Sequence, residues 1–428
     1  SPAAGTGCTR PPGAWRSVQA GRNREESALK FRRFDPGSCG FPRPLISPLP
    51  DTPAWPSPAR WFSPPARYCA ANHFRHFTRG RYALGEAFRL AGIGRQGALL
   101  APAYHCVTML DPALALDAEI HLYPLQADLS PDPMALERLL GTLQRPVKAL
   151  LATHYFGIAQ DFSHLKAWCV DHGIALIEDC SHVLLTEHFR AAGTGIHGHF
   201  VTSSPYKFFA CDDGGVLYAA DAQRLDPVAT TPATLIEELR GLKNAVERSR
   251  GRTLRSRDSA SIDERLELLS ATKLDWGNDQ LIDRDDPSSL FSIASATTSS
   301  LRSSQFVVDH SSIDENIRRR RENYQRWVRT VAAVPNCRAL FPLLPADCTP
   351  YMFPLHIDHP NPHFHWLKHL GVPIWRWDEM ADSTCAISRD HRLHLLHLPC
   401  HQALTEGQMD WMTAALEKTL RHAVEGVQ

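Results

Sequence analysis

The sequence has neither a net charge nor a long apolar run, and each absence excludes a class of function. Its 46 basic residues (Lys and Arg) are matched by 46 acidic ones in 428 residues. A balanced chain has no global field that attracts nucleic acid or anionic membranes. No stretch approaches the roughly 18 uninterrupted apolar residues of a membrane helix. We therefore expect no nucleic-acid partner and no membrane partner.

The cysteines also lack a pattern. There are 11 of them, an odd number, and no two are spaced as C-x-x-C. Cys106, Cys169 and Cys180 lie in apolar stretches, where a free thiol behaves as a small hydrophobic side chain. We infer a reduced chain without a disulfide framework, which is typical of a cytoplasmic protein.

Hydrophobic periodicity is missing from residues 1–67, which hold 13 of the 32 prolines. Prolines scattered among Arg, Ser and Gly disfavour packed elements, so we expect the first forty residues to be disordered. Apolar side chains in residues 45–67 (Trp55, Trp61 and Phe62) favour an ordered arm there as an alternative. The predicted organisation is this N-terminal segment, a large domain (68–300) and a small C-terminal domain (301–428).

The large domain shows an alternation of helices and buried strands. Residues 81–94 ("RYALGEAFRLAGIG") have apolar residues at helical spacing and end in glycines, whereas residues 147–157 and 174–179 are apolar enough for buried strands. This alternation predicts a parallel sheet covered on both faces. Ligands bind beyond the carboxyl ends of such strands. Three segments with reactive side chains lie at those ends: "PAYHC", "HYFG" and "EDCSH".

After residue 300 the pattern becomes that of an α+β domain. Residues 313–334 predict a long helix, and a final helix opens at Thr405. Between them, three segments look like strands or extended chain: "PYMFPLHID", "GVPIWRW" and "LHLLHLPCHQ".

Two of the buried-strand ends carry groups that suit a cofactor. Asp179 ends a strand, where a buried carboxylate is costly unless it meets a cation; an N-cap is the structural alternative. Three hydroxyl residues (202–204) precede Lys207. Hydroxyls followed by a lysine suit a phosphate ester beside an imine-forming amine, although a plain turn has the same composition.

The start of the helix after Gly80 supplies a third feature. Free amides of the first helical turn can hold an anion, and Arg81 adds a charge; a plain helix start is the alternative. The three features together match the needs of pyridoxal phosphate, which are an amine, a carboxylate for the pyridinium nitrogen and a helix terminus for the phosphate.

The run from Gly80 to Gly215 resembles the DegT/DnrJ/EryC1/StrS aminotransferases, which are fold-type I enzymes of pyridoxal phosphate. "RGRYAL" is similar to the family's S-G-T-A-A-L helix start, and "EDCSH" to its E-D-A-A-Q. The block from Gly193 to Lys207 is similar to its G-T-x-G…F-S-F-x-P-x-K. This resemblance, over about residues 70–425, implies an α/β large lobe with a mainly parallel sheet covered by helices, and a smaller α+β C-terminal lobe.

The resemblance implies a role for each matching position. Lys207 would form the internal aldimine and move a proton between Cα and C4′, and Asp179 would pair with the pyridine nitrogen. His182 would face the phenolic oxygen of the cofactor. The implied phosphate contacts are the hydroxyl of Thr202 and the amides of Gly80, Arg81 and Tyr82.

Some positions depart from the family pattern. The ring-stacking aromatic aligns with Cys106, so Tyr104 or His105 is expected to take that role. Three other residues differ in charge from the family: Arg81 replaces Thr, His197 replaces Asp, and Asp212 replaces Gly. We find no counterpart of the G-x-N-x-R segment that a partner subunit lends to the phosphate; residues 276–284 ("WGNDQLIDR") fit its register poorly.

Two other concentrations of side chains favour structural roles. Five potential metal ligands lie within eleven residues: His391, His394, His397, Cys400 and His401. Polar and apolar residues alternate in their segment as in a strand, so we predict no metal site. The arginine run 318–321 lies on a helix with Glu315 and Glu322 nearby, which favours a solvated, salt-bridged face.

We therefore predict a pyridoxal phosphate-dependent aminotransferase. It would move an amino group from glutamate to a keto sugar nucleotide or a related biosynthetic ketone. Because active sites of the family lie between two subunits, the resemblance implies a homodimer. Two alternatives stay open: another reaction of the same cofactor, such as a lyase or dehydratase reaction, and a non-catalytic cofactor-binding homologue.

Overall fold

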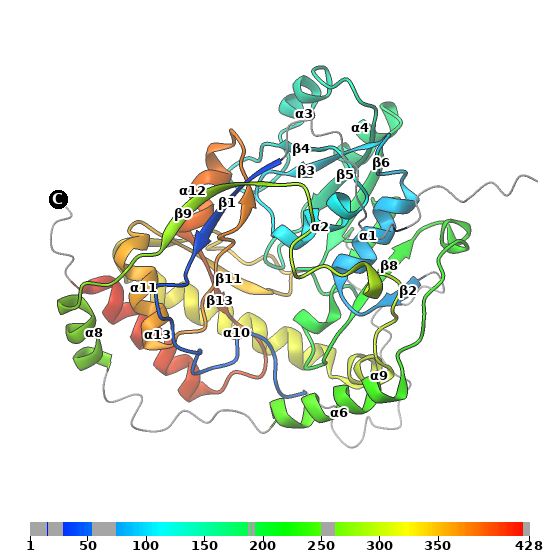
Figure 1. Ribbon diagram of the computed structural model, residues 1–428. Coiled ribbons are helices and arrows are strands. Elements are labelled where there is room, and N and C mark those ends of the chain that lie inside the picture. Colours follow the sequence, from blue (N-terminus) through cyan, green and yellow to red (C-terminus); the bar gives the residue numbers. More distant parts are fainter. Residues whose placement is uncertain are drawn as a thin grey trace, which may run out of the picture.

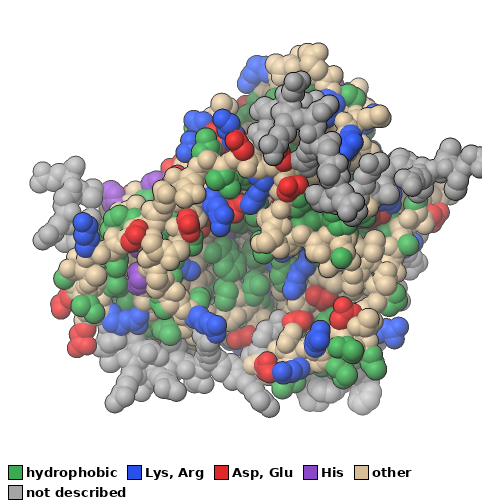
Figure 2. All heavy atoms as spheres, viewed as in Figure 1, with side chains coloured by type: hydrophobic (Ala, Val, Ile, Leu, Met, Phe, Trp, Pro, Cys, Tyr) green, Lys and Arg blue, Asp and Glu red, His purple; other side chains and the backbone are tan. Residues whose placement is uncertain are grey.

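The structure is a computed structural model, which describes residues 15, 29–53, 74–186, 190, 193–249 and 262–422. The elements up to about residue 225 surround one large sheet, and the C-terminal elements surround a second sheet beside it (Figure 1). On the face shown in Figure 2, hydrophobic side chains line the floor of a hollow near the centre.

The large sheet has seven strands in the order β2-β8-β7-β6-β5-β3-β4. The strands are β2 (Phe74–Phe77), β3 (Ala98–Pro102), β4 (Ile120–Tyr123), β5 (Val147–Thr153), β6 (Ala175–Cys180), β7 (Phe200–Ser203) and β8 (Gly215–Ala219). Strands β4, β3, β5, β6 and β7 are parallel; β8 pairs antiparallel with β7 and β2 antiparallel with β8, so only β8 runs in the opposite direction. The predicted α/β fold with a mainly parallel sheet is confirmed.

Helices cover this sheet as the apolar periodicity predicts. They are α1 (Gly80–Leu90), α2 (Val107–Ala115), α3 (Pro133–Leu140) and α4 (Ser163–Asp171). Helix α1 ends just before Gly92, which has a φ of +83°. Only glycine adopts this left-handed conformation without strain, so the predicted stop signal is confirmed.

The C-terminal lobe is built on the antiparallel sheet β10-β11-β13. Its strands are β10 (Cys337–Ala339), β11 (Met352–Ile357) and β13 (Leu395–Pro399), and its helices are α8 (Ile262–Ala271), α10 (Ile313–Val331), α11 (Pro360–Leu370), α12 (Ala386–His394) and α13 (Glu406–Arg421). Helix α13 begins with a capping box between Thr405 and Gln408. The predicted strand in "LHLLHLPCHQ" was wrong in its first two residues, because they end helix α12.

A third sheet, β12-β1-β9, joins segments far apart in the chain. Strand β1 (Leu29–Asp35) pairs antiparallel with β9 (Asn278–Arg284) and with the short β12 (Met380–Ala381). It buries Phe31 and Phe34. The expectation of disorder over the first forty residues was therefore wrong for β1. Trp55, Trp61 and Phe62 lie outside the described residues, and the domain boundaries stay a prediction.

Between the lobes, the chain from 220 to 310 forms α6 (Leu235–Ser249), α9 (Arg302–His310) and the short 3₁₀ turns η3 (Ala222–Leu225) and η4 (Ile293–Ser295). Within the described ranges, no helix is both long enough and apolar enough to cross a membrane.

Candidate functional site

The carboxyl ends of β6 and β7 present oxygen-bearing side chains on one face. Side chains alternate between faces along a strand, so Asp179 and Ser181 share a face, as do Thr202 and Ser204. The strands are parallel, with Asp179 opposite Thr202. The Thr202 hydroxyl donates to Asp179 Oδ1 over 3.4 Å, and the Ser204 hydroxyl to Ser181 Oγ over 3.1 Å. The predicted carboxylate and hydroxyls therefore lie together.

The N-terminus of helix α1 adjoins the two serines. A β-carbon on Gly80 would lie 2.0 Å from Ser204 Oγ and 3.2 Å from Ser181 Oγ, so only glycine permits this approach. The first amides of a helix have no partner within the helix and favour an anion. We call Gly80, Ser181 and Ser204 the hydroxyl cradle. Ser204 is one of the three hydroxyl residues that the sequence suggested for a phosphate ester, whereas Ser181 was not predicted, although "EDCSH" contains it.

The side chains of Arg81 and Tyr82 point away from the hydroxyl cradle. The guanidinium of Arg81 donates to the carbonyl oxygen of Leu290, and the Tyr82 hydroxyl accepts from the amide of Ser292 over 3.4 Å. The Tyr82 amide donates to the carbonyl oxygen of Arg79 over 3.0 Å, so of these two residues only Arg81 offers its backbone amide for the phosphate contacts that the resemblance implies. Those contacts, and that of Thr202, stay predictions.

Lys207 ends the 3₁₀ turn η2 (Pro205–Lys207), which directly follows β7 and Ser204. It is only half-buried, and its Nζ lies 5.3 Å from the centroid of the Tyr351 ring, within cation–π range. The lysine therefore stands between the carboxylate face of the sheet and a group of aromatic side chains.

That aromatic group, which we call the aromatic wall, consists of Tyr104, Phe156, His182, Tyr351, Trp377 and His397. His182 stacks on Tyr351 with ring centroids 4.4 Å apart. Trp377 lies 5.7 Å from His182 and 4.7 Å from Tyr104. Three members (Tyr351, Trp377 and His397) come from the C-terminal part of the chain, so this half of the site depends on how the two lobes pack.

The histidines of the aromatic wall are neutral. Burial, reinforced by the charge of Lys207, holds the pKa of His182 well below its usual range and lowers the pKa of His397 to about 3. The amide of Phe156 donates to His182 Nδ1 over 3.4 Å, which places the ring proton on Nε2. Burial raises the pKa of Tyr104, so its hydroxyl stays protonated, and it forms a hydrogen bond with His397 Nε2 over 3.0 Å.

Of the two candidates for the ring-stacking role, Tyr104 and His105, only Tyr104 belongs to the aromatic wall. The Nδ1 of His105 bonds to the carbonyl oxygen of Pro102, and its Nε2 accepts from the amide of Ala381, both over 3.0 Å. His105 is thus held in place by both nitrogens. Cys106 precedes helix α2, with its Sγ 3.2 Å from the hydroxyl of Thr108.

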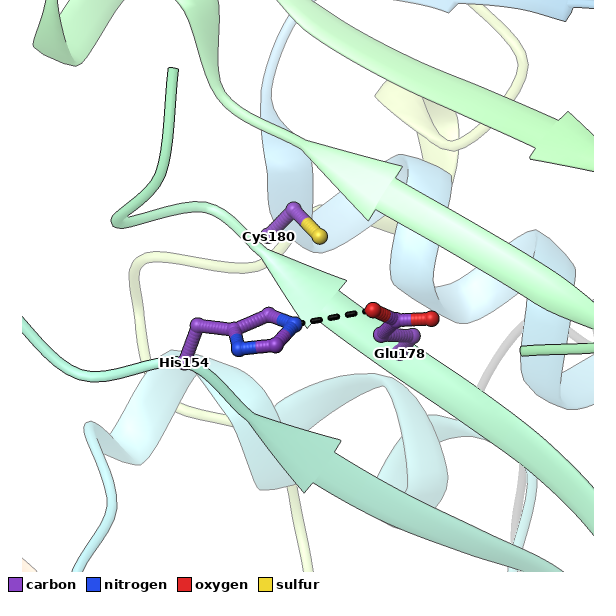
Figure 3. Close-up of side chains that lie close together, drawn as sticks. All are labelled: His154, Glu178 and Cys180. Atoms are coloured by element: carbon purple, nitrogen blue, oxygen red, sulfur yellow. Dashed lines mark hydrogen bonds and ion pairs between the residues drawn. The ribbon is translucent and has the colours of Figure 1, made fainter. Parts of the chain in front are cut away.

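The opposite face of β6 carries a structural cluster of His154, Glu178 and Cys180 (Figure 3). Glu178 accepts from His154 Nε2 over 2.8 Å and from the amides of Gly195, His197 and Gly198. Burial raises the pKa of Glu178, but these bonds outweigh it and hold the pKa below its usual value. His154 Nδ1 also accepts from a backbone amide. The cluster therefore fixes the loop that leads into β7.

A buried arginine ties the two halves of the site together. Arg320 of α10 is fully buried, and its guanidinium donates to five oxygens: those of Lys207, Phe208, Pro350, Tyr351 and the Gln402 side chain. It thus joins the lysine turn to the start of β11. The predicted solvated face is correct for Arg318, which pairs with Glu315 and Glu322, and wrong for Arg320.

The departures from the family pattern have partners of their own. The Asp212 carboxylate accepts from Asn244 of α6 over 3.3 Å, and His197 Nε2 lies 3.8 Å from Asp161. Strand β9 (Asn278–Arg284) takes up most of residues 276–284, and Arg284 at its end pairs with Glu379.

The five potential metal ligands near the C-terminus bond to different groups. His394 bonds to the carbonyl oxygen of Ile357, His397 to Tyr104 and His401 to the carbonyl oxygen of Ser47. His391 shares the Asp390 carboxylate with His356. The crowding along the sequence is therefore not one cluster in space.

The fold is that of fold-type I aminotransferases. The aminotransferase TlmJ from Streptoalloteichus hindustanus superposes with a TM-score of 0.55 at 18% identity, covering 83% of this chain and 88% of that one. NtdA from Bacillus subtilis, with bound cofactor PMP, superposes with a TM-score of 0.54 at 13% identity, covering 82% and 73%. At these identities the likeness concerns the fold alone.

The sequence comparisons match part of the chain to one aminotransferase family. Residues 64–237 match the sequence model of the DegT/DnrJ/EryC1/StrS aminotransferase family. The L-glutamine:scyllo-inosose aminotransferase of Streptomyces griseus is 27% identical over 164 residues, and the GDP-perosamine synthase of Vibrio cholerae 28% over 153. These matches cover 37% and 34% of this chain, and the chain spans only 37% and 38% of the two relatives' length. Residues 64–237 are thus similar to this family, and the curated relatives are distant.

Proposed function

We propose that this protein is a pyridoxal phosphate-dependent aminotransferase that acts on a keto sugar nucleotide or a related biosynthetic ketone. One observation carries the proposal. Asp179 and the hydroxyl cradle lie on one face at the carboxyl ends of β6 and β7, and Lys207 follows β7 in the turn η2, so groups suited to a pyridine nitrogen, a phosphate and an aldehyde carbon occur close together in the fold. The close approach of Gly80 to two hydroxyls suits a phosphate, because any larger residue would fill that space.

The residues that would hold the cofactor divide into two sets. Asp179 would keep the pyridine nitrogen protonated, while the hydroxyl cradle, the first amides of α1 and the hydroxyl of Thr202 would hold the phosphate. The Nε2–H of His182 would donate to the phenolic oxygen, since its Nδ1 is engaged by Phe156. Tyr104 is the side chain that we assign to contact with the ring face.

When bound, the cofactor supplies an electron sink that stabilises negative charge on the substrate carbon next to the nitrogen. Lys207 Nζ would bind the cofactor, be released by the amino donor and then carry the proton of that carbon. Neutral His182 and His397 suit this role, because cationic imidazoles beside Nζ would oppose its protonation. The aromatic wall would exclude water from the reacting atoms.

The substrates follow from the family. One relative carries L-glutamine and scyllo-inosose in its name, and another is a GDP-perosamine synthase. We propose glutamate as the amino donor and a cyclic ketone of this kind as the acceptor. We also propose a homodimer, in keeping with family habit.

The test uses the purified full-length protein with added pyridoxal phosphate. We expect a visible absorbance band that is absent in Lys207→Ala and retained in Lys243→Ala, a change at an exposed lysine of α6. A protein that stays colourless, or a band equally strong in Lys207→Ala, would contradict the proposal.

The second half of the test separates transamination from the two alternatives. Glutamate or glutamine should shift the band of the wild-type protein to that of the amine form of the cofactor, and a keto acceptor should restore it. A band that no amino acid alters would favour a non-catalytic cofactor-binding homologue. Release of a carbonyl product without an amine form would favour lyase or dehydratase chemistry.

A further inference from the structure

A separate pocket of about 270 Å³ lies between β1, β12 and α12. Six side chains carry the argument: Arg32, Asp382, Ser383, Ser388, Arg389 and Arg392. Figure 1 shows β1, β9 and α12 side by side, and Figure 2 shows basic side chains gathered over this part of the surface. We call it the arginine pocket.

The charges of the arginine pocket do not balance. Arg32 donates to Asp382 over 2.8 Å, and Arg392 donates to Asp279 over 2.6 Å. Within the part of the chain that the structure describes, the guanidinium of Arg389 has no hydrogen bond and no ion pair. Three guanidinium groups therefore face two carboxylates, which leaves one positive charge at the pocket.

The uncharged groups of the pocket also favour an anion. Among the described residues, the buried Oγ of Ser383 has no hydrogen-bond partner, which is costly for a hydroxyl. Helix α12 begins three residues later, without a side-chain cap and without an acidic residue in its first turn. A helix N-terminus of this kind attracts negative charge. An oxygen ligand would satisfy the hydroxyl and the free guanidinium together.

We infer that the arginine pocket binds a small oxyanion, namely the phosphate or carboxylate group of a small molecule. Arginine matches both groups because its planar guanidinium donates two parallel hydrogen bonds. The volume is below the roughly 300–1,000 Å³ of pockets that enclose a drug-sized ligand, so it admits one charged group rather than a whole nucleotide.

The arginine pocket is linked to the aromatic wall but distinct from the hydroxyl cradle. The Ser388 hydroxyl donates to the carbonyl oxygen of Ala103 over 2.6 Å, and the amide of Ala381 donates to His105. These bonds hold the residues on either side of Tyr104. An anion in the pocket therefore acts on the same short segment that supplies a ring of the aromatic wall, whether it is one end of a substrate or a free ion.

The test measures binding without turnover, so its result does not depend on the proposed function. Inorganic phosphate and malonate, a dicarboxylate that cannot be transaminated, are titrated into the full-length protein by calorimetry. The variants are Arg389→Ala and the charge-retaining Arg389→Lys, with circular dichroism as the folding control. Arg329→Ala, an exposed arginine of α10, is the matched control, and Ser204→Ala marks the hydroxyl cradle.

We expect at least one anion to bind saturably. Its affinity should fall by about tenfold or more in Arg389→Ala, as for the loss of a charged hydrogen bond, and less in Arg389→Lys. Arg329→Ala should bind as the wild type does, and Ser204→Ala should retain the binding event that Arg389→Ala weakens. If Ser204→Ala alone abolishes binding, if Arg389→Ala changes nothing, or if neither anion binds, the inference is overturned.

Once turnover is measured, the KM values show whether the bound oxyanion is part of a substrate or a free ion. A KM that rises for one substrate in Arg389→Ala, with kcat unchanged, identifies the oxyanion as part of that substrate. Unchanged KM values, together with lost anion binding, identify a free anion. Both results support the pocket.

Discussion

The hydroxyl cradle and the aromatic wall face Lys207 from two sides and are built in different ways. The cradle comes from residues 80–204 of one sheet, where strand alternation and one glycine place small polar groups on a shared face. The aromatic wall takes rings from residues 104 to 397, neutral and buried, and brought together by lobe packing. The hydroxyl cradle is thus a property of one sheet and the helix beside it, whereas the aromatic wall is a property of the two packed lobes.

Arg320 joins these two regions, so its loss should have the largest effect. Arg320→Ala removes five hydrogen bonds and should lower the free energy of unfolding by about 3–5 kcal/mol, measured by urea titration. Arg318→Ala, two residues earlier on the same helix, removes only exposed ion pairs and should lower the free energy of unfolding far less. An equal loss of unfolding free energy in the two variants would show that Arg320 does not connect the hydroxyl cradle with the aromatic wall.

The hydroxyl cradle is broken by Gly80→Ala. The new β-carbon would lie 2.0 Å from Ser204 Oγ, so we expect a loss of about 1–3 kcal/mol in stability together with weaker binding of pyridoxal phosphate. Gly407→Ala, where a β-carbon meets nothing within 4 Å, is the control. In the double variant Gly80→Ala/Ser204→Ala stability should recover but cofactor affinity should not, since a hydroxyl is still missing. Full recovery of both would argue against the cradle.

The aromatic wall should be the acid-sensitive half. The pKa of His397 is about 3 in the folded protein and about 6.5 in the unfolded chain, so the unfolded chain binds the extra proton between these values. Stability is therefore lost as pH falls below 6.5, by up to about 1.4 kcal/mol per pH unit for this one group.

Urea titrations at pH 7, 6 and 5 measure this slope. His397→Gln should reduce it, because the variant has one fewer buried imidazole to protonate. His164→Gln, at an exposed position, should leave it unchanged. Parallel slopes for all three proteins would contradict a neutral, buried His397.

The smallest expected effects come from removing the hydroxyl of a buried tyrosine inside the aromatic wall and of one outside it. Tyr104→Phe removes a 3.0 Å bond to His397, and Tyr123→Phe removes a 2.7 Å bond to the carbonyl oxygen of Leu151. Each should cost about 1 kcal/mol in urea unfolding. Only Tyr104→Phe should also change the KM of the keto acceptor, because only Tyr104 belongs to the aromatic wall. An equal KM change in both would remove the assigned role of Tyr104.

Sequence reasoning performed best where periodicity is local. Helix α1 with its glycine stop, the buried strands β5 and β6, and the long helix α10 all follow from apolar spacing, and each is present. It failed at β1, because a strand that pairs with residues 250 positions away has no local signal in a proline-rich region. It also failed at Arg320, since four consecutive arginines on a helix point in different directions and only the neighbouring lobe decides which is buried.

Three features follow from the sequence alone: the alternating α/β architecture, the resemblance to one aminotransferase family, and the order of Asp179 and Lys207 around a hydroxyl-rich strand end. They do so because strand and helix periodicities, and the glycine at position 80, act over short distances. Only the tertiary structure decided that Ser181 and Ser204 complete the hydroxyl cradle, that Arg320 holds the lysine turn, and that Tyr351 and His397 face the lysine. The cradle depends on the register of β6 and β7 and on the approach of α1. The contacts of Arg320, Tyr351 and His397 depend on lobe packing between segments more than a hundred residues apart, which no local pattern encodes.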